Sequence, residues 1–424
     1  MTRKTFLFII IGFIILLAAG GLLLVKKNQP TSTTGSSGGI HFRDFLPFGP
    51  KQTPTTEEET PTPEDTGGSI TPITPEDNVV DAELKQITPE SIAGYTLIEQ
   101  TTKVEGSAVE AVVTKEAVRY VDSTTGNIKD IFPDTLETKN VTNQTIPGIH
   151  RAEFGNKGTS IVANYLKPNG AEVETIYGTI LTDETGGVLQ ATVLPKDTFD
   201  FSISPDGKKF FYLFRFDTGS VGNTIAFDTK KKTTVFESPY VEWKSLWGEN
   251  ERITLTTKPS GVTPGFSYAL NPTTKTMGRI LGNVSGLTAL YGPTGDNALY
   301  ASGSQNSMSL YAYKQKSGAG ESAPFVTMPQ KCVFASETKV YCAVPNTIPT
   351  ALYPDSWYQG LVSFDDTIVL FDLGNFSQRT VGNPSVAGFS VDAIDLKINK
   401  AGTELFFKNK KDGSLWMMKL PTEQ

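Results

Sequence analysis

Histidine and cysteine are almost absent from this 424-residue sequence, which contains two of each. A site with several histidine ligands, or a Cys₄ zinc site, cannot be built from His41, His150, Cys332 and Cys342 within one domain. A Ser-His-Asp triad needs a histidine with an orienting carboxylate, and His150 is the only histidine after residue 90. The motifs G-x-S-x-G, H-E-x-x-H and C-x-x-C and the glycine-rich nucleotide loops are also missing. We therefore expect no metal, no cofactor and no catalytic residue of these types.

Excess basic charge is absent too. The chain has 38 Lys and Arg against 45 Asp and Glu, for a net charge of −7. Residues 1–50 carry a net charge of +4 and residues 51–90 carry −8, which leaves −3 for the rest of the chain. Nucleic-acid binding requires a basic surface that neutralises phosphates. We therefore expect no nucleic-acid partner.

One long apolar run occurs, at residues 6–25. It holds 20 residues without a charge, and 15 of them are Leu, Ile, Phe or Val. At ~1.5 Å per residue a helix of this length spans the ~30 Å hydrocarbon core of a bilayer. A cleaved signal peptide has a shorter apolar core, whereas residues 22–25 continue the run past the small residues 18–21. Residues 1–27 are therefore predicted to be an uncleaved transmembrane signal anchor in the lipid bilayer.

The charges that flank this run do not decide its orientation. Arg3 and Lys4 precede it and Lys26 and Lys27 follow it, so the positive-inside rule nearly ties. We favour a cytoplasmic N-terminus because only a short segment precedes the run. The prediction is a single-pass protein of the cell membrane with its folded domain outside the cytoplasm.

Residues 28–90 are dominated by Pro, Thr, Ser, Gly and acidic residues. Such a segment cannot bury enough apolar surface to offset the entropy lost on ordering. It is predicted to be a disordered linker, which acts as a spacer between the membrane and the folded domain.

An aromatic patch, IHFRDFLPFGP, interrupts the linker at residues 40–50. One interpretation is a short linear motif, centred on Phe42, Arg43, Phe45 and Phe48, that docks on a partner or on the folded domain. The other is a group of aromatic side chains that enter the membrane interface.

After residue 90 the sequence contains a repeated strand-and-turn unit. An apolar, partly aromatic strand is followed by a polar turn in seven places. The copies are AVRYVDSTTG (from Ala117), IYGTILTDETGG (from Ile176), NTIAFDTKKK (from Asn223), FSYALNPTTK (from Phe266), SLYAYKQKSG (from Ser309), TIVLFDLGN (from Thr367) and SLWMMKLP (from Ser414). Most copies are about 40–50 residues apart, which is the period of four-stranded propeller blades, and two longer spacings indicate insertions.

A second repeated unit is a hairpin, clearest in FSISPDGKKFFYL (from Phe201) and LKINKAGTELFFK (from Leu396). At these residues the chain resembles the TolB-type, WD-repeat-like β-propeller family, whose blades carry an SPDG hairpin followed by an LW-containing strand. The resemblance covers residues 91–424 and is strongest at residues 204–207 and 414–418. It implies an all-β propeller fold, here with seven blades and with six or eight as alternatives, and it does not imply a function.

Ring closure is expected to use an N-terminal strand. The seventh copy lies close to Gln424, so the last blade lacks room for its outermost strand in this sequence. A strand near residues 95–101 is predicted to supply it, because closure removes exposed sheet edges.

Cys332 and Cys342 lie symmetrically about Glu337 in KCVFASETKVYCAV. If residues 335–338 turn the chain, the two cysteines face each other across a hairpin and can form a disulfide. The alternative is a pair of buried free thiols. A disulfide requires an oxidising compartment, which agrees with an extracytoplasmic domain.

The largest insertion falls at residues 344–366. It contains the candidate binding residues Tyr353, Asp355, Trp357 and Tyr358. Loops on a rigid scaffold commonly carry function, and Tyr and Trp dominate interface hot spots. The alternative is a compact loop whose aromatic side chains fold back and cap the blade. Another pair, Trp243 and Trp247, is instead interpreted as packing between blades.

These observations favour a binding or scaffolding module for an unknown protein, peptide or glycan at the cell surface. The alternative is a carbohydrate-active hydrolase or lyase that uses Asp, Glu and Arg in the central funnel. Asp365, Asp366, Asp392 and Asp395 occur as two pairs, although acids in such positions commonly serve turns. A dense, convergent cluster in the funnel favours the enzyme, and an apolar or scattered lining favours binding. A third possibility is a subunit of an envelope assembly.

Overall fold

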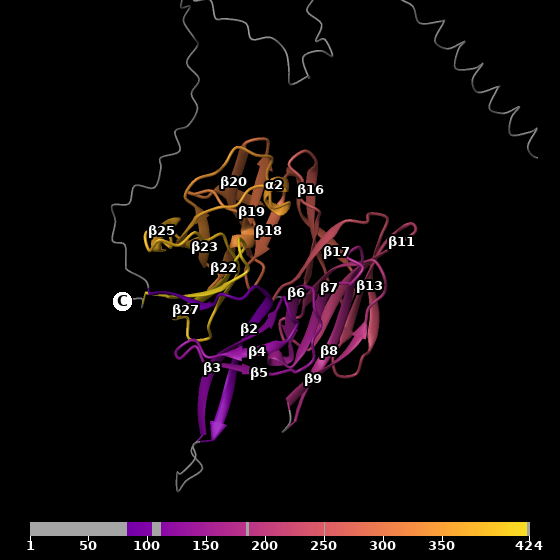
Figure 1. The fold of residues 1–424 in the computed structure, drawn as a ribbon. Coiled ribbons are helices and arrows are strands. Elements are labelled where there is room, and N and C mark those ends of the chain that lie inside the picture. Colours follow the sequence, from indigo (N-terminus) through magenta and orange to yellow (C-terminus); the bar gives the residue numbers. More distant parts are fainter. Residues whose placement is uncertain (1–82, 104–111, 184–185, 250, 422–424) are drawn as a thin grey trace, which may run out of the picture. The chain divides into compact units, whose positions relative to one another are not determined.

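The computed structural model describes residues 83–103, 112–183, 186–249 and 251–421. They form seven four-stranded antiparallel sheets arranged as the blades of a β-propeller (Figure 1). The prediction of an all-β, seven-bladed propeller is confirmed. The predicted membrane anchor and aromatic motif lie outside the described residues, and within those residues no helix has the length and apolar character needed to cross a bilayer.

The first six blades each take their four strands in chain order. The first contains β2 (Ile92–Lys103), β3 (Val112–Asp122), β4 (Ile128–Ile131) and β5 (Thr138–Asn140). The second contains β6 (Ile149–Gly155), β7 (Ser160–Leu166), β8 (Val173–Asp183) and β9 (Gly186–Val193). The third contains β10 (Thr198–Ile203), β11 (Lys209–Phe216), β12 (Gly219–Ala226) and β13 (Lys232–Ser238). The fourth contains β14 (Trp243–Trp247), β15 (Ile253–Thr257), β16 (Pro264–Leu270) and β17 (Met277–Ser285).

The remaining blades follow the same plan until the last. The fifth contains β18 (Thr288–Tyr291), β19 (Asn297–Ser304), β20 (Ser307–Lys314) and β21 (Ala319–Ser322). The sixth contains β22 (Cys332–Phe334), β23 (Lys339–Pro345), β24 (Asp366–Asp372) and β25 (Ser377–Gly382). The seventh contains β26 (Ala393–Ile398), β27 (Glu404–Asn409), β28 (Leu415–Lys419) and β1 (Leu84–Thr88). Short helical turns occur at η2 (Asn156–Gly158), η3 (Pro329–Lys331) and α2 (Asp355–Tyr358).

The first strands of the blades gather at the centre of the ring. β6 contacts both β2 and β10, and β10 contacts β14. In Figure 1 the labels of β2 and β6 are central, whereas those of β9, β13 and β25 are peripheral. Clusters of buried apolar side chains fill the spaces between neighbouring blades. Trp243 belongs to the cluster between the third and fourth blades and Trp247 packs against it, as predicted.

An N-terminal strand closes the ring, but it is not the predicted one. β1 pairs with β28 and supplies the outermost strand of the seventh blade, and Ile87 packs in the cluster shared with the first blade. Residues 95–101 instead lie in β2, the first strand of the first blade. The predicted linker boundary at residue 90 is therefore wrong, because residues 84–88 belong to the propeller.

The repeated units correspond to defined strand pairs. The SPDG hairpin is the turn from β10 to β11, where Gly207 has φ +71° and Ser204 Oγ accepts the Lys209 N–H at 2.9 Å. Six of the seven strand-and-turn copies are third strands, but the first copy is β3, a second strand. The long first spacing is therefore a change of strand and not an insertion. The other long spacing is a true insertion, between β23 and β24.

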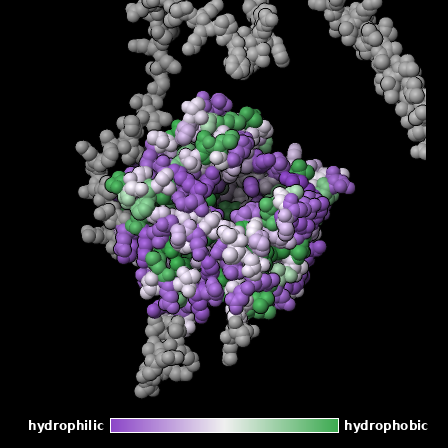
Figure 2. All heavy atoms as spheres, in the orientation of Figure 1, coloured by the Kyte–Doolittle hydropathy of each residue, from purple (hydrophilic) through white to green (hydrophobic). Residues whose placement is uncertain are grey.

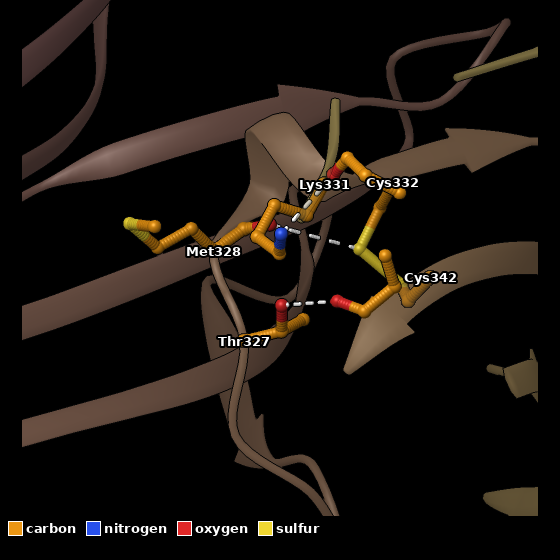
Figure 3. Close-up of a disulfide and its surroundings, with 7 residues drawn as sticks. Thr327, Met328, Lys331, Cys332 and Cys342 are labelled. Carbon is orange, nitrogen blue, oxygen red and sulfur yellow. Dashed lines mark hydrogen bonds between the residues drawn. A yellow bond between two sulfur atoms is a disulfide. The ribbon is translucent and has the colours of Figure 1, made fainter. Parts of the chain in front are cut away.

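The two cysteines form a disulfide across the β22–β23 hairpin (Figure 3). Cys332 and Cys342 are direct partners in the strand register, with Cα atoms 4.1 Å apart. Residues 335–338 make the turn, and both side chains lie in the apolar cluster between the fifth and sixth blades. Close by, the Thr327 hydroxyl donates a hydrogen bond to the Ala343 carbonyl at 2.6 Å.

Candidate functional site

Two of the four candidate binding residues in the insertion are buried. Tyr353 is 0% exposed and Trp357 is 3% exposed. Both pack with Phe364, Met308 and Met328 in a small apolar cluster. The alternative interpretation, in which the aromatic side chains cap the blade, describes these two residues. They cannot contact a ligand in this conformation.

The other two candidates lie at the margin of the insertion. The Asp355 carboxylate accepts the backbone N–H of Gly261 at 2.7 Å, which connects α2 to the fourth blade. Tyr358 is 42% exposed, so it alone of the four presents much of its surface. Desolvation by the surrounding protein raises the pKa of Tyr358, and the carboxylate of Asp200 contributes. The Tyr358 hydroxyl is therefore neutral at neutral pH.

Beneath the insertion lies a buried group of charges. The Lys331 Nζ contacts Asp366 Oδ2 at 2.7 Å and the Ala393 carbonyl at 3.1 Å, and it also contacts Asp392. The side chains of Lys331, Asp366 and Asp392 are all 0% exposed. Asp392 also accepts hydrogen bonds from Trp357 Nε1 at 3.0 Å and from the Phe364 N–H at 3.1 Å. This network fastens the insertion to the sixth and seventh blades, and its members are out of reach of a ligand.

The two carboxylates of this network share one lysine. Burial raises the pKa of Asp366 to about 6, and Asp392 also raises it while Lys331 lowers it. The second carboxylate oxygen of Asp366, Oδ1, has no hydrogen-bond partner among the described residues. A buried carboxylate without a full set of donors favours its protonated form.

Charged side chains on the first strands form a second group at the centre. The group, here named the channel cluster, consists of Arg151, Glu153, Asp200, Lys244, Asp395 and Lys397. Central channels are common ligand sites in propeller-shaped proteins. The face drawn in Figure 2 is hollowed near its middle, and its surface around the hollow is mainly hydrophilic.

Asp200 joins three neighbouring blades within the channel cluster. It accepts a hydrogen bond from Arg151 Nη1 on the second blade at 2.6 Å and another from the Ser245 N–H on the fourth. Arg151 also donates to Glu153 Oε1 at 2.8 Å and to the Phe201 carbonyl at 2.7 Å. Asp200 is 2% exposed, whereas Arg151 is 32% and Glu153 is 34% exposed. Arg151 and Glu153 therefore reach solvent, and Asp200 anchors Arg151, which in turn pairs with Glu153.

Lysines and a further carboxylate complete the channel cluster. Lys244 is 54% exposed, with its Nζ 3.7 Å from Asp200. Lys397 lies 3.4 Å from Asp395 and over the ring of Tyr95, 4.1 Å from its centroid. Positive and negative groups are therefore interspersed at the centre, and each of these carboxylates has a cationic neighbour.

Two features set Glu153 and Asp395 apart. Desolvation raises the pKa of Glu153, and Asp200 and Asp395 raise it further while Arg151 lowers it. Asp395 has φ +51°, within an irregularity of the β26–β27 pairing between Ile394 and Lys397. Strained backbone of this kind tends to occur at functional sites, where it redirects a side chain. Within the described residues, no group of three or more His, Cys, Asp or Glu side chains could hold a metal ion.

The sequence predicts the insertion and, in its enzyme interpretation, Asp, Glu and Arg side chains in the funnel, but it does not identify the members of the channel cluster. Asp395 is only one of its paired acids. Arg151, Asp200 and Lys244 come from three blades and share no motif, so no spacing in the sequence connects them. Each of them lies on the first strand of its blade, and first strands surround the channel. This position is the one feature of the sequence that could have indicated the cluster. The linear-motif candidates Phe42, Arg43, Phe45 and Phe48 lie outside the described residues.

No protein-family model matches this sequence, and no curated protein matches it. Among solved structures, an oligogalacturonate lyase from Vibrio parahaemolyticus is 9% identical, with a TM-score of 0.47 over 78% of this chain and 99% of the other. TolB from Acinetobacter baumannii is 11% identical, with a TM-score of 0.41 over 77% of this chain and 79% of the other. The β-propeller domain of the trilobed protease from Pyrococcus furiosus is 10% identical, with a TM-score of 0.42 over 65% of this chain and 83% of the other. These similarities are to propellers of differing activity, and they assign no function to this chain.

Proposed function

We propose that this chain is a membrane-anchored, extracytoplasmic binding protein whose channel cluster captures a polypeptide segment that carries both signs of charge. Residues 6–25 would anchor it in the bilayer, and the Pro/Thr-rich segment after them would act as a spacer. Such a tether keeps a binding site at high local concentration near the surface.

The presence of both signs of charge in the channel cluster carries this proposal. Lys244, Arg151 and Lys397 lie among Glu153 and Asp395, and all five are between 32% and 54% exposed. A ligand of one charge sign would meet repulsion at part of this surface, whereas a mixed-charge peptide can complement it. The ion pairs also leave Arg151 and Asp200 already ordered, which lowers the entropic cost of binding.

The proposal can be tested with the full chain in lipid nanodiscs. A peptide array that compares acidic, basic and mixed-charge sequences should select mixed-charge peptides. Lys244→Glu should weaken binding about tenfold, or about 1.4 kcal/mol, because it replaces an attractive charge with a repulsive one. Lys419→Glu is the matched control, because Lys419 is 55% exposed on the outer part of the seventh blade. An equal loss of peptide affinity in both variants would contradict the proposal, and so would selection of peptides of a single charge sign.

The convergence of charged side chains at the centre and the raised pKa of Glu153 favour a second candidate, a carbohydrate-active enzyme. A carboxyl group with a raised pKa beside an arginine is suited to proton transfer. This candidate predicts that the wild-type protein cleaves a polysaccharide and that Glu153→Gln reduces the rate at least 100-fold without loss of binding. Incubation with neutral and acidic polysaccharides, followed by chromatography of the products, tests it. Absence of products with the wild-type protein would rule it out for those substrates.

A further inference from the structure

The interface between the fourth and fifth blades differs from the other six. Each of the others encloses a cluster of buried apolar side chains, but within the described part of the chain no such cluster joins the fourth blade to the fifth. Hydroxyl groups meet there instead. The Tyr291 hydroxyl donates to Ser267 Oγ at 2.8 Å, and Ser267 lies 3.0 Å from Thr256 Oγ1.

A hollow of about 380 Å³ opens at this interface, between β17 and the β19–β20 hairpin. This volume lies within the range of small-ligand sites, roughly 300–1,000 Å³. Its polar lining includes Asn283, Tyr300, Ser302, Ser304, Ser307 and Tyr311. None of the residues that line the hollow is charged.

Strand alternation explains the polar lining. On β19 and β20 the apolar residues Leu299, Leu310 and Ala312 pack against the sixth blade. Successive side chains of a strand point to opposite faces of its sheet. The intervening tyrosines and serines therefore face the fourth blade, where no cluster of buried apolar side chains meets them within the described residues.

A pair of stacked tyrosine rings forms one wall of the hollow. Tyr300 and Tyr311 are register partners on β19 and β20, with ring centroids 4.9 Å apart and planes 13° from parallel. Tyr313 packs edge-on against Tyr300, with ring centroids 6.1 Å apart. Burial raises the pKa of Tyr300, so its hydroxyl remains protonated at neutral pH. The wall thus combines an apolar aromatic surface with hydroxyl donors.

The polar groups of this wall have no partners within the described residues. The side chains of Ser302, Ser304, Ser307 and Asn283, and the hydroxyls of both stacked tyrosines, form no hydrogen bond there. Asn283 and Ser307 are exposed and the other four residues are half-buried. All of these groups can therefore exchange hydrogen bonds with water for hydrogen bonds with a ligand.

The insertion of the sixth blade holds the β19–β20 hairpin in place. Gln305 forms a β-bridge with Leu352, the Asn306 N–H donates to the Ala351 carbonyl at 2.8 Å, and the Tyr353 N–H donates to the Ser304 carbonyl at 3.1 Å. The buried Tyr353 and Trp357 anchor the insertion in turn. One wall of the hollow is therefore rigid before any ligand arrives.

From these features we infer that the hollow between the fourth and fifth blades binds an uncharged saccharide. Hydroxyl and amide groups without partners suit the hydroxyls of a sugar ring, and an aromatic wall suits its apolar face. The absence of charged lining residues disfavours an acidic or basic ligand, whose desolvation would not be compensated. This site is separate from the channel cluster, so the chain would hold a peptide and a glycan independently.

The test uses the full chain in nanodiscs and four neutral disaccharides: maltose, cellobiose, lactose and diacetylchitobiose. Saturation-transfer NMR detects binding, and calorimetry measures its affinity. At least one disaccharide should bind, and Tyr311→Ala and Ser307→Trp should each weaken it at least tenfold. Ser307 is exposed, so the tryptophan can fill the hollow without disturbing the core. Tyr240→Ala is the matched control, because Tyr240 is 68% exposed and lies outside the hollow.

Thermal unfolding of each variant separates loss of the site from loss of the fold. The inference is supported if affinity falls in Ser307→Trp while its melting temperature is unchanged. It is overturned if none of the four disaccharides binds, if binding is equal in all variants, or if digalacturonate binds more tightly than every neutral disaccharide. Raising the salt concentration should change the affinity for the saccharide little, but it should lower the affinity of the channel cluster for a charged peptide. The experiment therefore distinguishes a lack of saccharide binding in the hollow from a lack of peptide binding at the channel cluster.

Discussion

The ammonium group of Lys331 lies 2.7 Å from the carboxylate of Asp366, and neither side chain is exposed to solvent. The pair connects the start of the sixth blade to its third strand, at the point where the insertion returns to the sheet. Asp392, which precedes the seventh blade, is the third member of the network. The aromatic insertion therefore rests on buried charge as well as on apolar packing.

Replacement of Lys331 by methionine should destabilise the protein by about 3–5 kcal/mol. It would leave two buried carboxylates without a cation, and an uncompensated buried charge is costly. Chemical denaturation measures the change in the free energy of unfolding. Lys316→Met is the control, because Lys316 is 82% exposed and pairs with an exposed Asp296, so its loss should cost less than about 1 kcal/mol. Similar losses of unfolding free energy in the two variants would contradict a stabilising role for the network of Lys331, Asp366 and Asp392.

Asp366 should make stability fall as pH rises from about 4 to about 6. The pKa of Asp366 is about 6 in the folded protein against 3.8 as the ordinary value, so the folded state binds this proton more tightly. A raised carboxyl pKa gives stability at low pH that is lost as pH rises through the folded value, here up to about 3 kcal/mol.

The difference between wild type and Asp366→Asn isolates this effect from that of other carboxylates. Unfolding free energies measured from pH 4 to pH 7 should show wild type losing stability relative to the variant across this window. A difference that stays constant with pH would show that Asp366 does not titrate there.

Removal of the disulfide should lower the free energy of unfolding by about 3 kcal/mol. Cys332 and Cys342 are 10 positions apart, and the chain-entropy model gives a value of this size for so short a loop. The double variant Cys332→Ala, Cys342→Ala can be compared with wild type under oxidising and reducing conditions. Reduction should destabilise wild type and leave the variant unchanged, and equal responses would argue against the bond.

Ring closure by β1 should be sensitive to a charge at Ile87. Ile87 is 3% exposed in the cluster between the seventh and first blades, so Ile87→Asp buries a carboxylate there and should cost more than about 3 kcal/mol. Gln86 is exposed on the same strand, so Gln86→Asp should change stability by less than about 0.5 kcal/mol. If the two variants have the same free energy of unfolding, residues 84–88 do not close the ring.

The fold could be predicted from the sequence because its determinants are local and repeated. Asp228, Asn271 and Asp372 each accept a backbone N–H in the turn that follows a third strand, which is why a polar residue recurs there. The cysteine pair was predictable for the same reason, since a symmetric hairpin places its residues opposite one another.

The closing strand and the channel cluster were not predictable in this way. Residues 84–88 follow an acidic, proline-rich segment, and only their pairing with β28 makes them a strand. Arg151, Asp200 and Ser245 meet because three blades converge, and no period in the sequence encodes that contact. Lys331 likewise finds its partners 35 and 61 residues away.

Site-directed photo-crosslinking from position 244 tests binding at the channel cluster most directly. A photoreactive side chain placed there in the full chain should form a covalent adduct with a selected mixed-charge peptide, and added salt should reduce the yield. The same side chain at position 419, which has similar exposure on the outer part of the seventh blade, should give little adduct. Equal yields from the two positions would contradict the account.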